Sequence, residues 1–101
     1  MLNIRTEKQE TALCVALEGR LDTTTAPELD KKLKDELGEA ATLIFDMKEL
    51  SYISSAGLRV LLSAQKIMNR QGSMIVKNVP EVIMEIFDVT GFCDILTIEK
   101  A

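Results

Sequence analysis

The 101-residue sequence contains no histidine and no tryptophan. Without histidine it lacks the commonest general base and the commonest metal ligand, so we expect neither a histidine-based active site nor a metal site. Aromatic residues make up only 4% of the chain, and 12 basic residues face 16 acidic ones, with no run of Lys or Arg. These features argue against a surface that binds nucleic acid or an anionic membrane.

Long apolar runs are also missing. No apolar stretch approaches the length that crosses a bilayer, and the N-terminal MLNIRTEKQE is not a signal peptide. The only two cysteines, Cys14 and Cys93, have no second cysteine or histidine at metal-ligand spacing. We interpret them as reduced core thiols, which is typical of a cytoplasmic protein.

What remains is an ordinary composition for one globular domain spanning residues 1–101. The ALCVALE stretch at 12–18 is almost continuously apolar, which predicts a strand covered on both faces. The predicted strands are 2–8, 12–18, 42–46 (ending in Asp46), 73–77 and 94–99.

Three helices are predicted between these strands. The first starts near Thr25, which has capping-box spacing to Glu28, and it stops at Gly38. The second carries its apolar stripe on Leu58, Leu61, Leu62 and Met68 and ends between Asn69 and Gly72, and the third runs from Pro80 to Thr90-Gly91. Strands alternating with helices predict an α/β fold, with a partly parallel sheet and an antiparallel N-terminal hairpin.

Polar residues gather where the predicted strands end. Asp22, Asp46 and the pair Ser54-Ser55 all fall at or near carboxyl ends, where such sheets place ligand and partner sites, so we expect them on one surface. The serine pair has two interpretations. Serine is a favoured helix N-cap, worth about 1 kcal/mol over alanine, and it is also a phosphate acceptor. Gly57 costs about 0.5–1 kcal/mol inside a helix, which either close packing or access to the backbone must offset.

The segment TLIFD, LSYI, Ser54-Ser55 and AGLRVLL resembles the signature of the STAS domain family, whose best-known soluble members are bacterial anti-sigma factor antagonists. GRLDTTTAPEL and GSMIVKNVPEVIMEIFDVTGF resemble the family's neighbouring segments, so the resemblance covers nearly the whole chain. It implies a STAS-type mixed β-sheet packed with α-helices. In the family's usual order of aspartate, serine, small residue and glycine, the phosphorylated serine falls on Ser55. The chain departs from that pattern at Ser54, where the aspartate would stand, and at Arg59, where many members carry glycine.

The resemblance implies partner switching. The unmodified protein binds an anti-sigma factor that is itself a serine kinase, and so releases a sigma factor. Phosphorylation of Ser55 separates the complex, and a serine phosphatase resets it. The implied contact residues are Asp22, Thr23, Thr24, Thr25, Ser54, Ser55, Gly57 and Leu58. The protein is then a substrate and regulator in the cytoplasm, with no cofactor of its own and no enzymatic activity.

Three alternatives stay open. A receiver-like phosphoacceptor would use Asp46 with Lys77, but the acidic pair that holds magnesium in receivers is missing. A nucleotide-binding module would need a glycine-rich phosphate loop, and none is present. A STAS subunit of a transport or signalling complex that is never phosphorylated would keep the same surface, and Ser54 in place of the aspartate favours it.

Overall fold

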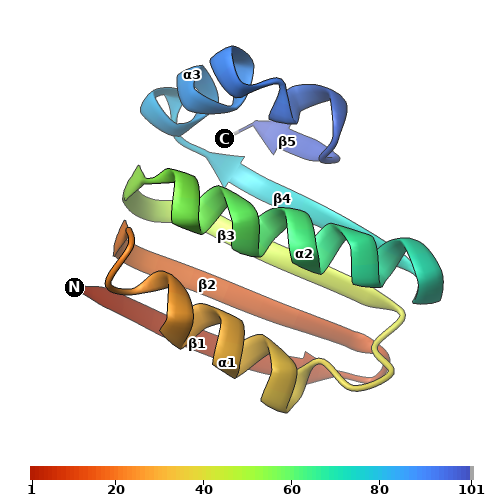
Figure 1. Ribbon diagram of the computed structural model, residues 1–101. Coiled ribbons are helices and arrows are strands. Elements are labelled where there is room, and N and C mark those ends of the chain that lie inside the picture. Colours follow the sequence, from red (N-terminus) through yellow and green to blue (C-terminus); the bar gives the residue numbers. More distant parts are fainter. Residues whose placement is uncertain (101) are drawn as a thin grey trace.

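The structure is a computed structural model that describes residues 1–100. Ala101, the last residue of the predicted single domain, lies outside the described residues. After an opening hairpin, helices alternate with strands (Figure 1). The elements in chain order are β1 (Leu2–Gln9), β2 (Ala12–Leu21), α1 (Ala26–Glu36), β3 (Thr42–Ile53), α2 (Ser55–Gln71), β4 (Ser73–Val79), α3 (Glu81–Thr90), the 3₁₀ helix η1 (Phe92–Asp94) and β5 (Ile98–Lys100).

The strands form one sheet in the order β1-β2-β3-β4-β5. β1 pairs with β2 antiparallel, and every other neighbouring pair is parallel, which confirms the predicted mixed sheet. α1 and α2 run side by side across one face of the sheet, and α3 lies on the far side of α2 from α1 (Figure 1). Because β2 and β3 are parallel, both end at the edge of the sheet where α1 and α2 begin.

The two faces of the sheet differ in burial. In β2, Leu13, Val15 and Leu17 are buried under the helices, whereas Cys14 and Ala16 on the opposite face are only half-buried. The prediction that 12–18 is covered on both faces is therefore wrong. The apolar run is continuous because small residues line its second face, and no helix of the described residues packs there (Figure 1).

Both cysteines are half-buried. Cys14 lies on this open face of the sheet, and Cys93 lies in η1, where its thiol donates to Asp88 at 2.9 Å. The interpretation as a core thiol is therefore wrong for Cys14, whereas Cys93 is partly buried against the core, and neither cysteine forms a disulfide.

Three predicted strands have the wrong bounds. β2 does not end at residue 18 but continues to Leu21. β3 does not end at Asp46 but continues to Ile53, so Asp46 lies in mid-strand on the open face. There its carboxylate accepts from the Asn78 side chain at 3.2 Å and from the backbone N–H of Lys48 at 3.1 Å. At the C-terminus, the predicted strand 94–99 begins in η1 with Asp94, continues as a connection over residues 95–97, and is a strand only in the short β5.

Candidate functional site

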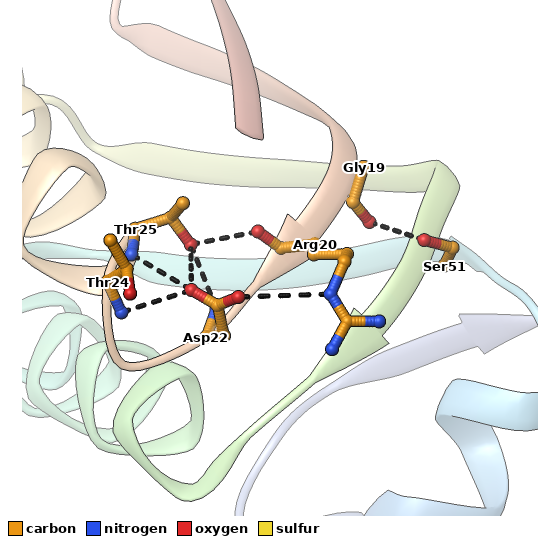
Figure 2. Close-up of polar contacts among 6 residues, drawn as sticks. All are labelled: Gly19, Arg20, Asp22, Thr24, Thr25 and Ser51. Atoms are coloured by element: carbon orange, nitrogen blue, oxygen red, sulfur yellow. Dashed lines mark hydrogen bonds and ion pairs between the residues drawn. The ribbon is translucent and has the colours of Figure 1, made fainter. Parts of the chain in front are cut away.

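The turn between β2 and α1 is held by reciprocal hydrogen bonds between Asp22 and Thr25 (Figure 2). The Asp22 carboxylate accepts from the backbone N–H of Thr24 at 3.0 Å and of Thr25 at 3.1 Å. In return, the Thr25 hydroxyl accepts from the backbone N–H of Asp22 at 2.9 Å and donates to the Arg20 carbonyl at 2.8 Å. Thr25 is the N-cap residue of α1, but its side chain caps no helical N–H, so the predicted Thr25–Glu28 capping box is wrong. The hydroxyl serves the turn that precedes the helix.

These hydrogen bonds keep Asp22 ionised. The Thr25 backbone N–H, with smaller help from the Thr25 hydroxyl and the Thr24 N–H, lowers the pKa of the Asp22 carboxyl against the opposing effect of burial. The Arg20 guanidinium lies nearby, with Nε 3.8 Å from the carboxylate (Figure 2). The turn therefore presents a fixed negative charge, with Thr23 and Thr24 exposed beside it.

The junction between β3 and α2 lies next to this turn. The backbone N–H of Ser54 donates to the carbonyl of Leu21 at 2.9 Å, which joins the end of β3 to the end of β2. The carbonyl of Ser54 then accepts the first helical hydrogen bond of α2, from Leu58 at 3.0 Å. Ser54 and the Asp22 turn are thus placed together by backbone contacts between residues more than thirty positions apart.

The two adjacent serines point to different environments. Ser54 is the N-cap residue of α2, yet its side chain makes no cap hydrogen bond, and its Oγ is buried without a hydrogen-bond partner among the described residues. Ser55 is the first residue of the helix and is exposed. Of the two hydroxyls, the one that another molecule can reach is that of Ser55.

Gly57 fits a position with no room for a side chain. A Cβ at Gly57 would lie 2.7 Å from Cγ of Leu21 and 2.9 Å from Cγ1 of Ile53. Close packing of α2 on the strand ends therefore explains this glycine, and access to the backbone does not.

We call Asp22, Thr23, Thr24, Ser54 and Ser55 the carboxyl-end surface. Thr23, Thr24 and Ser55 are exposed there, and Asp22 and Ser54 are half-buried. The other three predicted contact residues are buried in this chain: Thr25, Gly57 and Leu58. They position the surface more than they form it.

Asp46 does not join this surface. It lies within β3, in register with Lys77 of β4, and six residues of β3 separate it from Ile53. Burial raises the pKa of its carboxyl, but the Lys48 N–H, the Asn78 amide and the charges of Lys77 and Lys48 together lower it. The expected convergence of Asp46 with Asp22 and the serines is wrong, because the strand is longer than its apolar core. In residues 1–100 no group of His, Cys, Asp and Glu is arranged to hold a metal ion.

Sequence reasoning missed one pair at this end of the sheet. Arg20 and Tyr52 are register partners on β2 and β3, and the guanidinium lies 4.2 Å from the centre of the ring. Tyr52 is the only tyrosine in the chain and stands three residues before Ser55. That isolated aromatic residue beside the serine pair was the available signal.

Comparisons with known proteins concern the family and the fold of the chain. The family model of the STAS domain matches residues 3–101. An anti-sigma-B factor antagonist of Bacillus subtilis is 33% identical over 98 residues, which cover 96% of this chain and 90% of that protein. No helix among the described residues is long and apolar enough to cross a membrane.

Solved structures share the fold. An anti-sigma factor antagonist from Mycobacterium paratuberculosis superposes with a TM-score of 0.90 at 17% identity, covering 100% of this chain and 87% of that one. The Bacillus cell fate determinant SpoIIAA in its phosphorylated form gives a TM-score of 0.75 at 19% identity, covering 95% of this chain and 90% of that one. The sequence matches, extending over the whole sheet and the serine junction, show that this chain belongs to the STAS domain family.

Proposed function

We propose that this protein is an anti-sigma factor antagonist, which binds an anti-sigma serine kinase through the carboxyl-end surface and so releases a sigma factor. Phosphorylation of Ser55 by that kinase ends the contact, and a serine phosphatase restores it. The observation that carries the proposal is the exposed hydroxyl of Ser55 at the first residue of α2, beside the Asp22 turn. The cycle takes place in the cytoplasm, with this protein as substrate and regulator and the partner as catalyst.

The names of similar proteins support the proposal. The Bacillus subtilis relative is an anti-sigma-B factor antagonist, and SpoIIAA has been solved in a phosphorylated form. These statements concern those proteins. Their relevance here rests on the shared fold and on the Ser55 position.

The energetics of a switch at Ser55 favour an effect on binding over an effect on folding. A phosphate adds about −1.5 to −2 charges and three strong acceptors. At a helix N-terminus, the free N–H groups and the helix dipole stabilise an anion by about 0.3–1 kcal/mol, so the domain tolerates it. A partner packed over Ser55 would have to desolvate the dianion, which costs several kcal/mol unless the charge is paired. About 2.8 kcal/mol is enough for a hundredfold loss of affinity.

The test is incubation with the anti-sigma serine kinase of the same genome, ATP and magnesium, followed by intact mass and site mapping. We expect one phosphate on Ser55, none on Ser55→Ala, and unchanged phosphorylation of the matched control Ser54→Ala. Ser55→Asp should keep its circular dichroism spectrum and lose the kinase in a binding assay.

Two results would contradict the proposal. Phosphate on Ser55→Ala would move the acceptor to another residue. No phosphorylation, together with equal kinase binding by Ser55→Asp and the parent protein, would favour the alternative of a STAS subunit that is never phosphorylated. The serine that replaces the family aspartate at position 54 is the observation on which that alternative rests.

A further inference from the structure

The outward face of α3 combines exposed apolar and acidic side chains. Ile83 and Phe87 are fully buried on the inner side of the helix, and the residues turned away from them are Glu81, Val82, Glu85, Asp88 and Val89. Val82 is 52% exposed and Val89 is 85% exposed. They stand seven residues apart, two turns of the helix, with Glu85 between them. We call these five residues the α3 face.

The α3 face carries negative charge that forms no ion pair among the described residues. On α1, acidic residues pair with lysines one turn away, as in Lys31–Asp35 at 3.1 Å and Lys34–Asp30 at 3.0 Å. In the part of the chain that the structure describes, no ion pair involves an acidic residue of α3. Residues 78–99 contain five acidic residues and no Lys or Arg.

Folding of α3 accounts for Glu81, which lies in the favourable first turn, and in part for Asp88, which accepts from the Cys93 thiol. It does not account for Glu85 or for the two exposed valines. Valine on a solvated helix face loses side-chain freedom and gains no packing in return. Asp88 lies in the last turn, near the negative end of the helix dipole, where no basic residue balances it. Residues that go against local helix preferences and gain no packing in return are expected mainly at functional surfaces.

Charge decides which kind of molecule can cover this face. Nucleic acid and anionic membranes are repelled by the carboxylates, and a second copy would bring acidic residues against acidic residues. We propose that the α3 face is a docking surface for a positively charged amphipathic segment of another protein. The two valines contact its apolar side chains and the carboxylates contact its Lys or Arg. The turn that leads into α1 and the helix α3 lie on opposite sides of α2 (Figure 1). We expect this second contact not to depend on phosphorylation of Ser55.

The test uses the full chain and a defined probe, an amphipathic helical peptide of leucine and lysine about five turns long. Its binding is measured by isothermal titration at low and at high salt. The variant Glu81→Gln/Glu85→Gln/Asp88→Asn should lose at least about tenfold in affinity and most of the salt dependence. Val82→Ser/Val89→Ser should lose affinity without a change in salt dependence, and Ser55→Asp should bind as the parent protein does.

The matched control is Glu28→Gln/Asp30→Asn/Asp35→Asn, which changes the net charge by the same amount on α1. We expect it to lose less than about twofold, because the contact depends on where the charge lies. An equal loss in the control would overturn the proposal, and so would equal binding of a leucine–glutamate peptide. A parent protein that sediments as a dimer, and becomes monomeric in Val82→Ser/Val89→Ser, would assign the face to a second copy instead.

Discussion

At the scale of single residues, the hydroxyl of Ser54 has no hydrogen-bond partner in the described chain, although Ser54 is the N-cap residue of α2. A serine that caps a helix loses about 1 kcal/mol when it is replaced by alanine. Here we expect Ser54→Ala to change the free energy of unfolding by less than about 0.5 kcal/mol, or to raise it, because the buried hydroxyl is desolvated without compensation. Urea denaturation measures the difference.

Thr25→Ala is the companion variant. The Thr25 hydroxyl is buried and bonds to both the Asp22 N–H and the Arg20 carbonyl, so its removal should cost about 1–3 kcal/mol. If Ser54→Ala lost as much as Thr25→Ala, the Ser54 hydroxyl would have to form a cap in solution.

Gly57 is a second residue with a testable environment, because α2 packs closely on the strand ends there. Gly57→Ala would place a Cβ 2.7 Å from the Leu21 side chain, and overpacking of this kind costs about 1–3 kcal/mol. Alanine recovers about 0.5–1 kcal/mol of helix propensity, so we expect a net loss. The measurement is urea denaturation with the exposed Ser55→Ala as control, which should stay within about 0.5 kcal/mol of the parent. A more stable Gly57→Ala protein would show that α2 does not press on the strand ends.

At the scale of elements, the β2–α1 turn depends on an ionised Asp22. Its pKa is lower in the folded chain than the ordinary 3.8, chiefly because the Thr25 backbone N–H bonds to the carboxylate. A depressed pKa adds stability that is present above pH 3.8 and is lost as the pH falls through the folded value. Asp22→Asn keeps an acceptor oxygen but removes the charge.

We therefore expect Asp22→Asn to be less stable than the parent near neutral pH, with the gap closing in acid. Chemical denaturation over a series of pH values measures this. Asp46 also has a lowered pKa, so its ionisation contributes to the pH dependence of stability as well. Asp46→Asn, measured in parallel, separates the contribution of Asp46 from that of Asp22. A gap that stayed constant into strong acid would show that the charge of Asp22 does not hold the turn.

The same scale shows why Asp46 was misplaced. TLIF has a clear apolar pattern, and the charged Asp46 that follows it indicates the end of a strand. In the fold, Asp46 lies on the open face, where a carboxylate can meet the Asn78 side chain, and β3 continues along β2 to Ile53. Pairing with β2 prolongs the strand. The apolar pattern of one segment holds no information about that pairing.

At the scale of the whole molecule, the sheet has one face under helices and one face without them. Purely parallel sheets are nearly always covered on both faces, and this sheet is mainly parallel. Because one face of this sheet is open and side chains alternate along a strand, adjacent residues of β3 lie in contrasting environments. Phe45 is fully buried under the helices, and Ile44 is half-buried on the open face.

We expect Phe45→Ala to cost about 3–5 kcal/mol and Ile44→Ala about 1 kcal/mol, because only the first leaves a cavity in the core. Thermal or urea unfolding of the two variants checks the contrast. Equal losses would mean that the face bearing Ile44 is covered in solution.

The sequence by itself determined the number and order of the main strands and helices, the mixed sheet and the serine junction between β3 and α2. These follow from periodicities of 2 and 3.6 residues and from helix-ending glycines, which act within one segment. Only the tertiary structure decided which face of the sheet is open, where β3 ends, and that Ser55 is exposed while the Ser54 hydroxyl is buried. Those outcomes depend on contacts between distant segments, such as the hydrogen bond from Ser54 to Leu21, and a side chain at a strand–helix junction takes its direction from them.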